Sequence, residues 1–281
     1  MCIGDVKAMS QPRRAAHRSA VVGVLWSCVL ALVALTWLVQ TGRAYWWWDF
    51  ALAHLAARSA DSYTHTGTLV VYRALNVPGD LRVDAVLTLA AVLVLARRRA
   101  GWATLLPLLL LATAPVEYAA KDLVYSPPPT PEVVLRPSAA DALPYYTQQS
   151  PASCPAAVAS PLGLLDDVSC PGGSFLSGAA ARIVIVAGVA LWWTARRRWR
   201  VLPRLIVALT LVAYALAAGV GRVYLRWHWP SDVIGGYLLG AILLCIILLV
   251  AQPRRAPRTV APRALALLGQ PPLQPSDGAS R

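Results

Sequence analysis

The stretch Gly221-Arg-Val-Tyr-Leu-Arg-Trp-His-Trp-Pro-Ser-Asp232 lies directly before the last long apolar run of the chain. It places Arg222, His228 and Asp232 in the spacing Arg-x5-His-x3-Asp. A cation can hold an anionic group, an imidazole can attack that group, and a carboxylate can fix the tautomer of the imidazole. At the water-facing end of a membrane helix, this combination predicts phosphoryl transfer, with His228 and Asp232 as the catalytic pair.

The composition is that of a membrane protein. Hydrophobic residues make up 57% of the chain and charged residues only 14%, whereas a soluble domain is about half apolar and about a quarter charged. The net charge of +13 would suggest a nucleic-acid partner in a soluble protein. Here the positive-inside rule accounts for it, so we expect membrane lipids and no nucleic acid as partners.

The hydropathy pattern predicts an all-α integral membrane protein with a bundle of six transmembrane helices. The apolar runs are residues 20–40, 81–96, 102–120, 178–194, 201–220 and 233–250, each near the length that spans hydrocarbon. Arginine clusters lie at alternate ends of these runs. This alternation predicts a multi-pass protein of the plasma (inner) membrane with both termini cytoplasmic and the phosphoryl site extracytoplasmic. The preference for Arg over Lys and the many alanines suggest a high-GC bacterium.

The sequence divides into a basic cytoplasmic tail (residues 1–19), a membrane domain (residues 20–251) and a Pro-rich tail (residues 252–281) expected to be disordered. On the outer side, residues 46–80 begin with a tryptophan cluster typical of an interfacial aromatic belt, and a surface helix is predicted over 49–59. The larger outer loop, residues 121–177, lies between the third and fourth predicted helices.

The large outer loop contains Cys154 and Cys170. Because this loop is predicted to face an oxidising compartment, we expect the two to form a disulfide, with two free thiols as the alternative. Their spacing lacks the second Cys or His pair of a zinc signature, so no metal site is predicted.

Two further polar positions are predicted to meet the Arg-x5-His-x3-Asp segment on the outer side. The chain has two lysines among 26 basic residues, and Lys121 stands where the third apolar run ends, either as an anion ligand or as a side chain reaching the headgroups. Ser177 and Gly178 open the fourth apolar run. Backbone N–H groups at such a helix start can bind an anion, although Ser177 could equally be an ordinary helix cap.

Taken in order, these three segments resemble the type 2 phosphatidic acid phosphatase superfamily, which also includes the vanadium haloperoxidases. The family pattern is Lys-x6-Arg-Pro, then Pro-Ser-Gly-His, then Ser-Arg-x5-His-x3-Asp, and the resemblance covers about residues 20–250. It implies a six-helix bundle that removes phosphate from lipid phosphates or diphosphates with no cofactor or metal. It also implies that Lys121, Ser177, Gly178 and Arg222 bind the phosphoryl group.

The chain departs from the family pattern at several positions. Ala179 replaces the histidine that protonates the leaving oxygen in the family, and Pro128 replaces the arginine of the first motif. Leu176 and Gly221 replace the family Pro and Ser. Loss of a general acid typically slows a reaction by about 10²–10⁴-fold. Hydrolysis of a diphosphate would be slowed less, because its phosphate leaving group needs less protonation. Arg226, Arg136 or His65 could compensate for the missing groups.

Three functions remain open from the sequence. The first is hydrolysis of a lipid phosphate or polyprenyl diphosphate at the outer leaflet through a phosphohistidine on His228. The second is a catalytically impaired family member that binds a lipid phosphate or scaffolds a partner without turnover. The third is a transporter, and charged residues inside the apolar runs would favour this interpretation. The few charged residues in these runs, among them Asp84, Glu117 and Arg182, lie near their ends.

Overall fold

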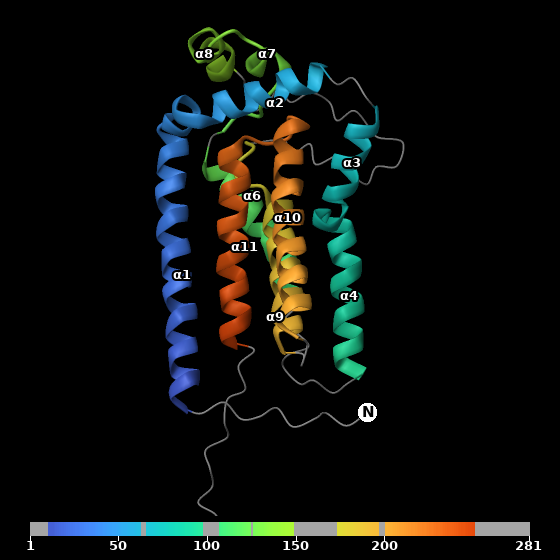
Figure 1. Ribbon diagram of the computed structural model, residues 1–281. Coiled ribbons are helices and arrows are strands. Elements are labelled where there is room, and N and C mark those ends of the chain that lie inside the picture. The colour runs from blue at the N-terminus through green and yellow to red at the C-terminus, as the bar shows by residue number, and fades with distance from the viewer. Residues whose placement is uncertain are drawn as a thin grey trace, which may run out of the picture. The chain divides into compact units, whose positions relative to one another are not determined.

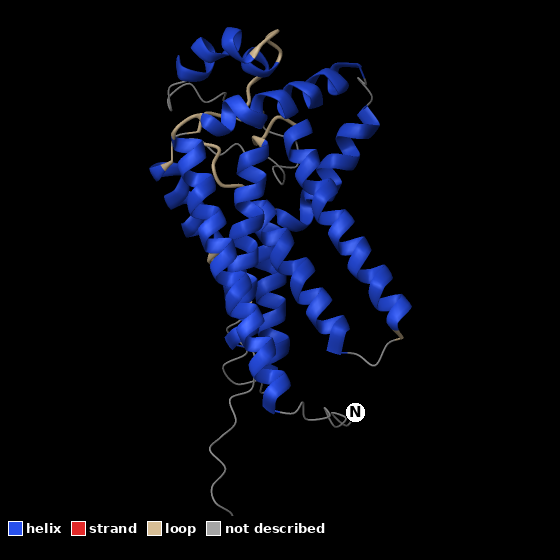
Figure 2. Ribbon diagram, turned by 60° about the vertical axis from the view of Figure 1, so that its left-hand side comes forward, coloured by secondary structure: helices blue, strands red, loops and turns tan. Residues whose placement is uncertain are grey.

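The computed structural model describes residues 11–62, 66–97, 107–124, 126–148, 173–196 and 200–250. Every regular element in these ranges is helical, and none of them contains a strand (Figure 2). The elements are α1 (Gln11–Gln40), η1 (Tyr45–Asp49), α2 (Phe50–Ser62), α3 (Thr66–Asn76), η2 (Val77–Gly79), α4 (Leu81–Arg97), α5 (Leu108–Leu111), α6 (Thr113–Leu123), α7 (Pro131–Val134), α8 (Ala139–Gln148), α9 (Gly178–Arg196), α10 (Val201–Tyr224) and α11 (Pro230–Val250).

The all-helical membrane class is confirmed, and the number of spans stays a prediction. Among the described residues, three helical segments are long and apolar enough to cross a membrane: Arg18–Gln40, Val201–Tyr224 and Pro230–Val250. The apolar part of α9, Gly178–Trp192, is shorter, and α4 has 17 residues. In the third predicted run, α5 and α6 are separate helices with Ala112 between them.

Helix α11 packs against two helices that are far apart in the sequence. It contacts α1 and α9, and α9 in turn contacts α10 (Figure 1). The α9 contact depends on two glycines one turn apart: a Cβ on Gly236 would lie 2.2 Å from the Ser177 carbonyl oxygen, and one on Gly240 would lie 2.5 Å from that of Ala181. Small residues at this spacing let helix backbones approach closely in lipid. The start of α9 is thereby held against the start of α11.

The segment between α1 and α3 forms a surface helix close to the predicted one, α2, which begins at Phe50 after the short η1 turn. Helix α2 contacts α7 and α10. The His54 Nδ1 lies 2.7 Å from the Val134 carbonyl oxygen, and the Tyr45 hydroxyl donates to the Ala139 carbonyl at 3.1 Å. These contacts attach α7 and α8, which belong to the large outer loop, to the segment that follows α1.

The turn between α10 and α11 brings the last motif together. Helix α10 ends at Tyr224, and Arg226 has a positive φ of 59° that reverses the chain. Pro230 then opens α11, as its fixed φ favours at a first helical position. The turn therefore joins the end of one helix to the start of the next, with His228 in between.

Several sequence predictions fall partly or wholly outside the described residues. His65, Cys154, Cys170 and the tail 252–281 all lie there. Helix α1 begins at Gln11, within the residues assigned to the basic tail.

Candidate active site

The imidazole of His228 is fully buried at the turn between α10 and α11. Its Nδ1 lies 3.0 Å from the Ser174 carbonyl oxygen and 3.6 Å from Asp232 Oδ2. A carbonyl can only accept, so Nδ1 carries the proton and Nε2 holds a lone pair. The Nε2 atom has no hydrogen-bond partner among the described residues. A buried, unsatisfied imidazole nitrogen is rare and calls for a functional explanation.

Asp232 contributes less to orienting His228 than the sequence predicted. At 3.6 Å its carboxylate is beyond hydrogen-bond distance of Nδ1, and the shorter contact is made by the Ser174 backbone. The Oδ2 atom instead accepts from the Trp229 N–H at 2.9 Å, as an acidic residue at the third helical position does in a capping box. Asp232 thus fixes the start of α11 and supplies negative charge beside the imidazole.

The segment leading into α9 links the three motifs. The Ser174 N–H donates to the Ser126 carbonyl at 2.6 Å, and the two serine hydroxyls lie 3.2 Å apart. The Ser177 N–H donates to the Asp232 carbonyl at 3.0 Å. Backbone after α6, backbone before α9 and the start of α11 therefore meet, as the motif order predicts.

Lys121 is buried and already paired. Its Nζ lies 2.6 Å from Glu117 Oε1, one turn earlier on α6. The other oxygen of Glu117 lies 3.2 Å from Arg182 Nη1, and Arg182 Nε lies 3.0 Å from Asp84 Oδ2. Two cations and two anions from α4, α6 and α9 thus form one buried, formally neutral network.

Gly178 is required by this network. A Cβ at this position would lie 1.5 Å from Glu117 Oε2, so any larger residue would expel the carboxylate. The sequence placed Gly178 among the phosphate ligands; in the structure it is the surface on which Glu117 packs.

Arg222 is buried in the last turn of α10. Its guanidinium carbon lies 5.7 Å from the centre of the Trp227 ring, and its carbonyl accepts from the Trp227 N–H at 3.0 Å. The side chain is therefore folded against the turn that carries His228.

The two positions where the family residues are missing are filled by packing. Ala179 is fully buried, and a Cβ built on Gly79 would lie only 2.8 Å from the Ala179 Cβ, so Gly79 packs closely against Ala179 and a larger side chain there would displace its neighbours. Pro128 accepts a backbone hydrogen bond from Thr130 at 2.9 Å, and the preceding Pro127 carbonyl accepts from the Trp229 indole. The proline segment thus contacts the histidine turn through its backbone.

The proposed compensating arginines make local backbone contacts. Arg136 Nε donates to the Glu132 carbonyl at 3.2 Å, just after α7. The Arg226 N–H donates to the Val223 carbonyl at 3.0 Å in the turn itself.

Asp49 is a site residue that the sequence interpretation missed. Its two carboxylate oxygens accept from the Ser231 N–H at 2.8 Å and the Ser231 hydroxyl at 2.6 Å. Burial, and to a smaller extent the nearby Asp232 carboxylate, raise the pKa of Asp49 to about 7. A carboxylate directly after a run of aromatic residues was the available signal. Likewise, Asp84, Glu117 and Arg182 have opposite charges in separate apolar runs, which predicts pairing in lipid.

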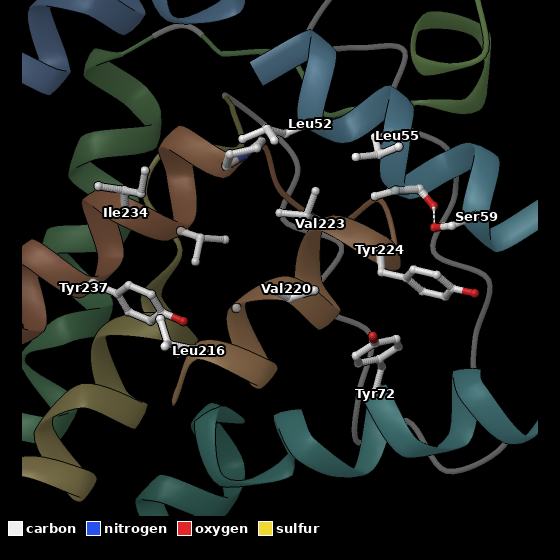
Figure 3. Close-up of a pocket in the computed structure, with 14 residues that line it drawn as sticks. Leu52, Leu55, Ser59, Tyr72, Leu216, Val220, Val223, Tyr224, Ile234 and Tyr237 are labelled. Carbon is white, nitrogen blue, oxygen red and sulfur yellow. Dashed lines mark hydrogen bonds between the residues drawn. The ribbon is translucent and has the colours of Figure 1, made fainter. Parts of the chain in front are cut away.

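An apolar groove opens beside the histidine turn (Figure 3). It has a volume of about 680 Å³ and is lined by α2, α3, α10 and α11. Leu52 and Leu55 face it from α2, and Tyr224 and Ile234 face it from the two helices joined by the turn (Figure 3). Pro230 and Val233 also line it, and these residues lie on either side of Asp232 in the chain.

The described residues thus form an all-helical membrane protein in which a buried His228 and Asp232 lie against the backbone of Ser174 and Ser177. The model of the PAP2 superfamily matches residues 100–256, more than half of the chain. The chain therefore belongs to the PAP2 superfamily, and its apolar helices place it with the membrane phosphatases of that superfamily.

A solved structure shares the fold. The transmembrane PAP2-type phosphatidylglycerolphosphate phosphatase from Bacillus subtilis superposes with a TM-score of 0.56 at 17% sequence identity. The match covers 80% of this chain and 94% of the other. No curated protein matches the chain.

Proposed function

We propose that this protein hydrolyses a lipid phosphate or polyprenyl diphosphate at the outer leaflet of the plasma membrane through a phosphohistidine. The observation that carries the proposal is the state of His228. Its Nδ1 proton is held by a backbone carbonyl, and its buried Nε2 lone pair is unused. An imidazole held in one tautomer with a free nitrogen is prepared for nucleophilic attack.

The reaction proceeds in two displacements. Nε2 attacks phosphorus, an N–P bond forms, and the bond to the leaving oxygen breaks. Water then attacks the phosphorus and releases phosphate, which restores the imidazole. Arg222 and the helix start at Ser177 would stabilise the charge on the phosphoryl oxygens.

The filled space at Ala179 narrows the substrate class. Position 179 holds no histidine that could protonate an alkoxide, and the Cβ of Ala179 lies against Gly79. A diphosphate releases a phosphate group, which leaves without a strong acid. We therefore favour a polyprenyl diphosphate over a lipid monophosphate, with its chain in the apolar groove of Figure 3.

A second candidate is binding without turnover, favoured by the pairing of Lys121 with Glu117. A cation that is already neutralised contributes less to a transition state with developing charge. In this case the same pocket would hold a lipid phosphate for a partner.

The experiment measures phosphate release in detergent, with a chelator present, from farnesyl diphosphate and dihexanoyl phosphatidic acid. We expect release by the wild type, loss of release in His228→Ala, and retention in His54→Ala, whose ring contacts Val134 instead. Acid-labile, base-stable labelling of His228 after a rapid quench would identify the intermediate. Absence of release, together with Arg222-dependent binding, would establish the second candidate.

A further inference from the structure

The lysine of the first motif is neutralised before any ligand binds. Lys121 and Arg182 carry two positive charges, Glu117 and Asp84 carry two negative ones, and all four side chains are buried. Charges in such a setting are screened little by solvent, so each pair strongly affects the affinity of its members for other ions.

Glu117 differs from Asp84 in where it lies. Both carboxylates face Arg182, but only Glu117 also contacts Lys121, at 2.6 Å. Only Glu117 packs on Gly178, at the start of α9. A carboxylate that bridges two cations beside a helix start has the contacts that a phosphoryl group would use there.

We propose that Glu117 is a specificity-determining residue: an internal counter-anion that competes with the phosphoryl group for Lys121. The inference rests on the proposed function, because it takes the pocket of His228 as a phosphoryl site. A phosphoryl group at the buried ammonium would compete with the Glu117 carboxylate that already contacts it. The penalty rises with the charge of the ligand, since a dianion depends more on Lys121 and repels Glu117 more strongly than a monoanion.

The experiment uses two soluble probes and the full chain in detergent at pH 8. Inorganic phosphate is mostly a dianion there, and dimethyl phosphate is a monoanion. We expect Glu117→Gln to strengthen phosphate binding by about tenfold, measured by ³¹P NMR titration, and dimethyl phosphate binding by clearly less. The amide keeps an oxygen that can accept from Lys121, so the change removes charge with little change in shape.

Asp84→Asn is the matched control, because it removes a buried carboxylate from Arg182 while leaving the Lys121 pair intact. We expect it to change phosphate affinity by less than about twofold. Equal strengthening in both variants, or an unchanged affinity in Glu117→Gln, would overturn the inference.

A measurement on the wild type covers the case in which Glu117→Gln does not fold. Infrared difference spectra on adding phosphate should show a shifted carboxylate band. The frequency of this band should change in Glu117→Asp, because the shorter side chain alters the contact with Lys121. Absence of any carboxylate change on binding contradicts the displacement. Turnover assays distinguish this inference from the proposed function. If the protein releases phosphate but Glu117→Gln does not change phosphate affinity, only this inference is wrong. If no variant binds phosphate, the proposed function is wrong as well.

Discussion

The two sides of the site are built in opposite ways. On the histidine side, formed by Ser174, His228 and Asp232, buried polar atoms are left without partners, namely His228 Nε2 and Asp232 Oδ1. On the lysine side, formed by Asp84, Glu117, Lys121 and Arg182, each charge faces an opposite charge within 3.2 Å, although neither carboxylate oxygen of Asp84 makes a hydrogen bond with a described residue. Unmet polar atoms are costly and are kept where chemistry needs them. The two sides therefore differ in charge pairing: among the described residues, the imidazole nitrogen proposed to react is unpaired, whereas the charges of the lysine side are paired with one another.

The strongest test of this comparison breaks the lysine side. Arg182→Met leaves Asp84 and Glu117 facing each other without their shared cation, and we expect a loss of about 3–5 kcal/mol in stability. Thermal unfolding in detergent measures it. The double variant Arg182→Met, Asp84→Asn should be milder, because one stranded carboxylate is removed and the Lys121 pair remains. If the single and double variants unfold alike, the network is not the source of stability.

Restoring the family histidine tests whether the missing acid can simply be put back. Ala179→His forces a ring against Gly79, so we expect destabilisation by about 1–3 kcal/mol and no gain in turnover. Ala187→His, a half-buried position further along α9, controls for adding a histidine to this helix. Faster phosphate release by the Ala179 variant would show that the pocket is more open than the packing indicates.

The pH dependence of stability sharpens the description of the histidine side. The pKa of Asp49 is raised to about 7 from 3.8, so the folded state holds a proton that the unfolded state releases. Stability should therefore be highest below about pH 4, fall between pH 4 and 7 by at most about 1.4 kcal/mol per pH unit, and then level off. Asp49→Asn should remove this slope in thermal unfolding measured across pH. A slope unchanged by the substitution assigns it to another group.

The smallest expected effect concerns the bond that holds α11. Ser231→Ala removes one of the two donors to Asp49, and we expect a loss of about 1 kcal/mol. Ser59→Ala, whose hydroxyl donates within its own helix to the Ala56 carbonyl, provides a matched comparison. A larger loss at Ser59 than at Ser231 would argue against a special role for the Asp49 contact.

The sequence predicted what is repeated along the helices and written in short motifs. Apolar runs predicted the membrane class and the positions of α1, α10 and α11, and the spacing of His228 and Asp232 predicted that these two residues lie close together. It did not predict the pairing of Lys121, because a lone lysine at a helix end reads the same whether its partner is lipid, ligand or Glu117. That partner is decided by how α6 and α9 pack, which Gly178 permits by lacking a side chain.

Asp49 shows a second reason why prediction stopped short. It follows three tryptophans, two of which, Trp46 and Trp47, are more than half exposed, so an interfacial belt was the natural interpretation. The carboxylate points the other way and caps α11, 182 residues further along the chain. Contacts between elements this distant in sequence leave no periodic pattern in either segment.

If His228 reacts as proposed, the Asp49 contact would link it to the tryptophan cluster predicted to lie at the bilayer surface. Tryptophans at the headgroup level follow the position of the lipid interface. Here they precede Asp49, which accepts hydrogen bonds from Ser231 in the first turn of α11, three residues after His228. A change in bilayer thickness would then shift the position of His228 through the Asp49–Ser231 contact. Turnover of the wild type should depend on the acyl-chain length of the vesicles. Asp49→Ala, which removes the contact with Ser231, should make turnover independent of that length.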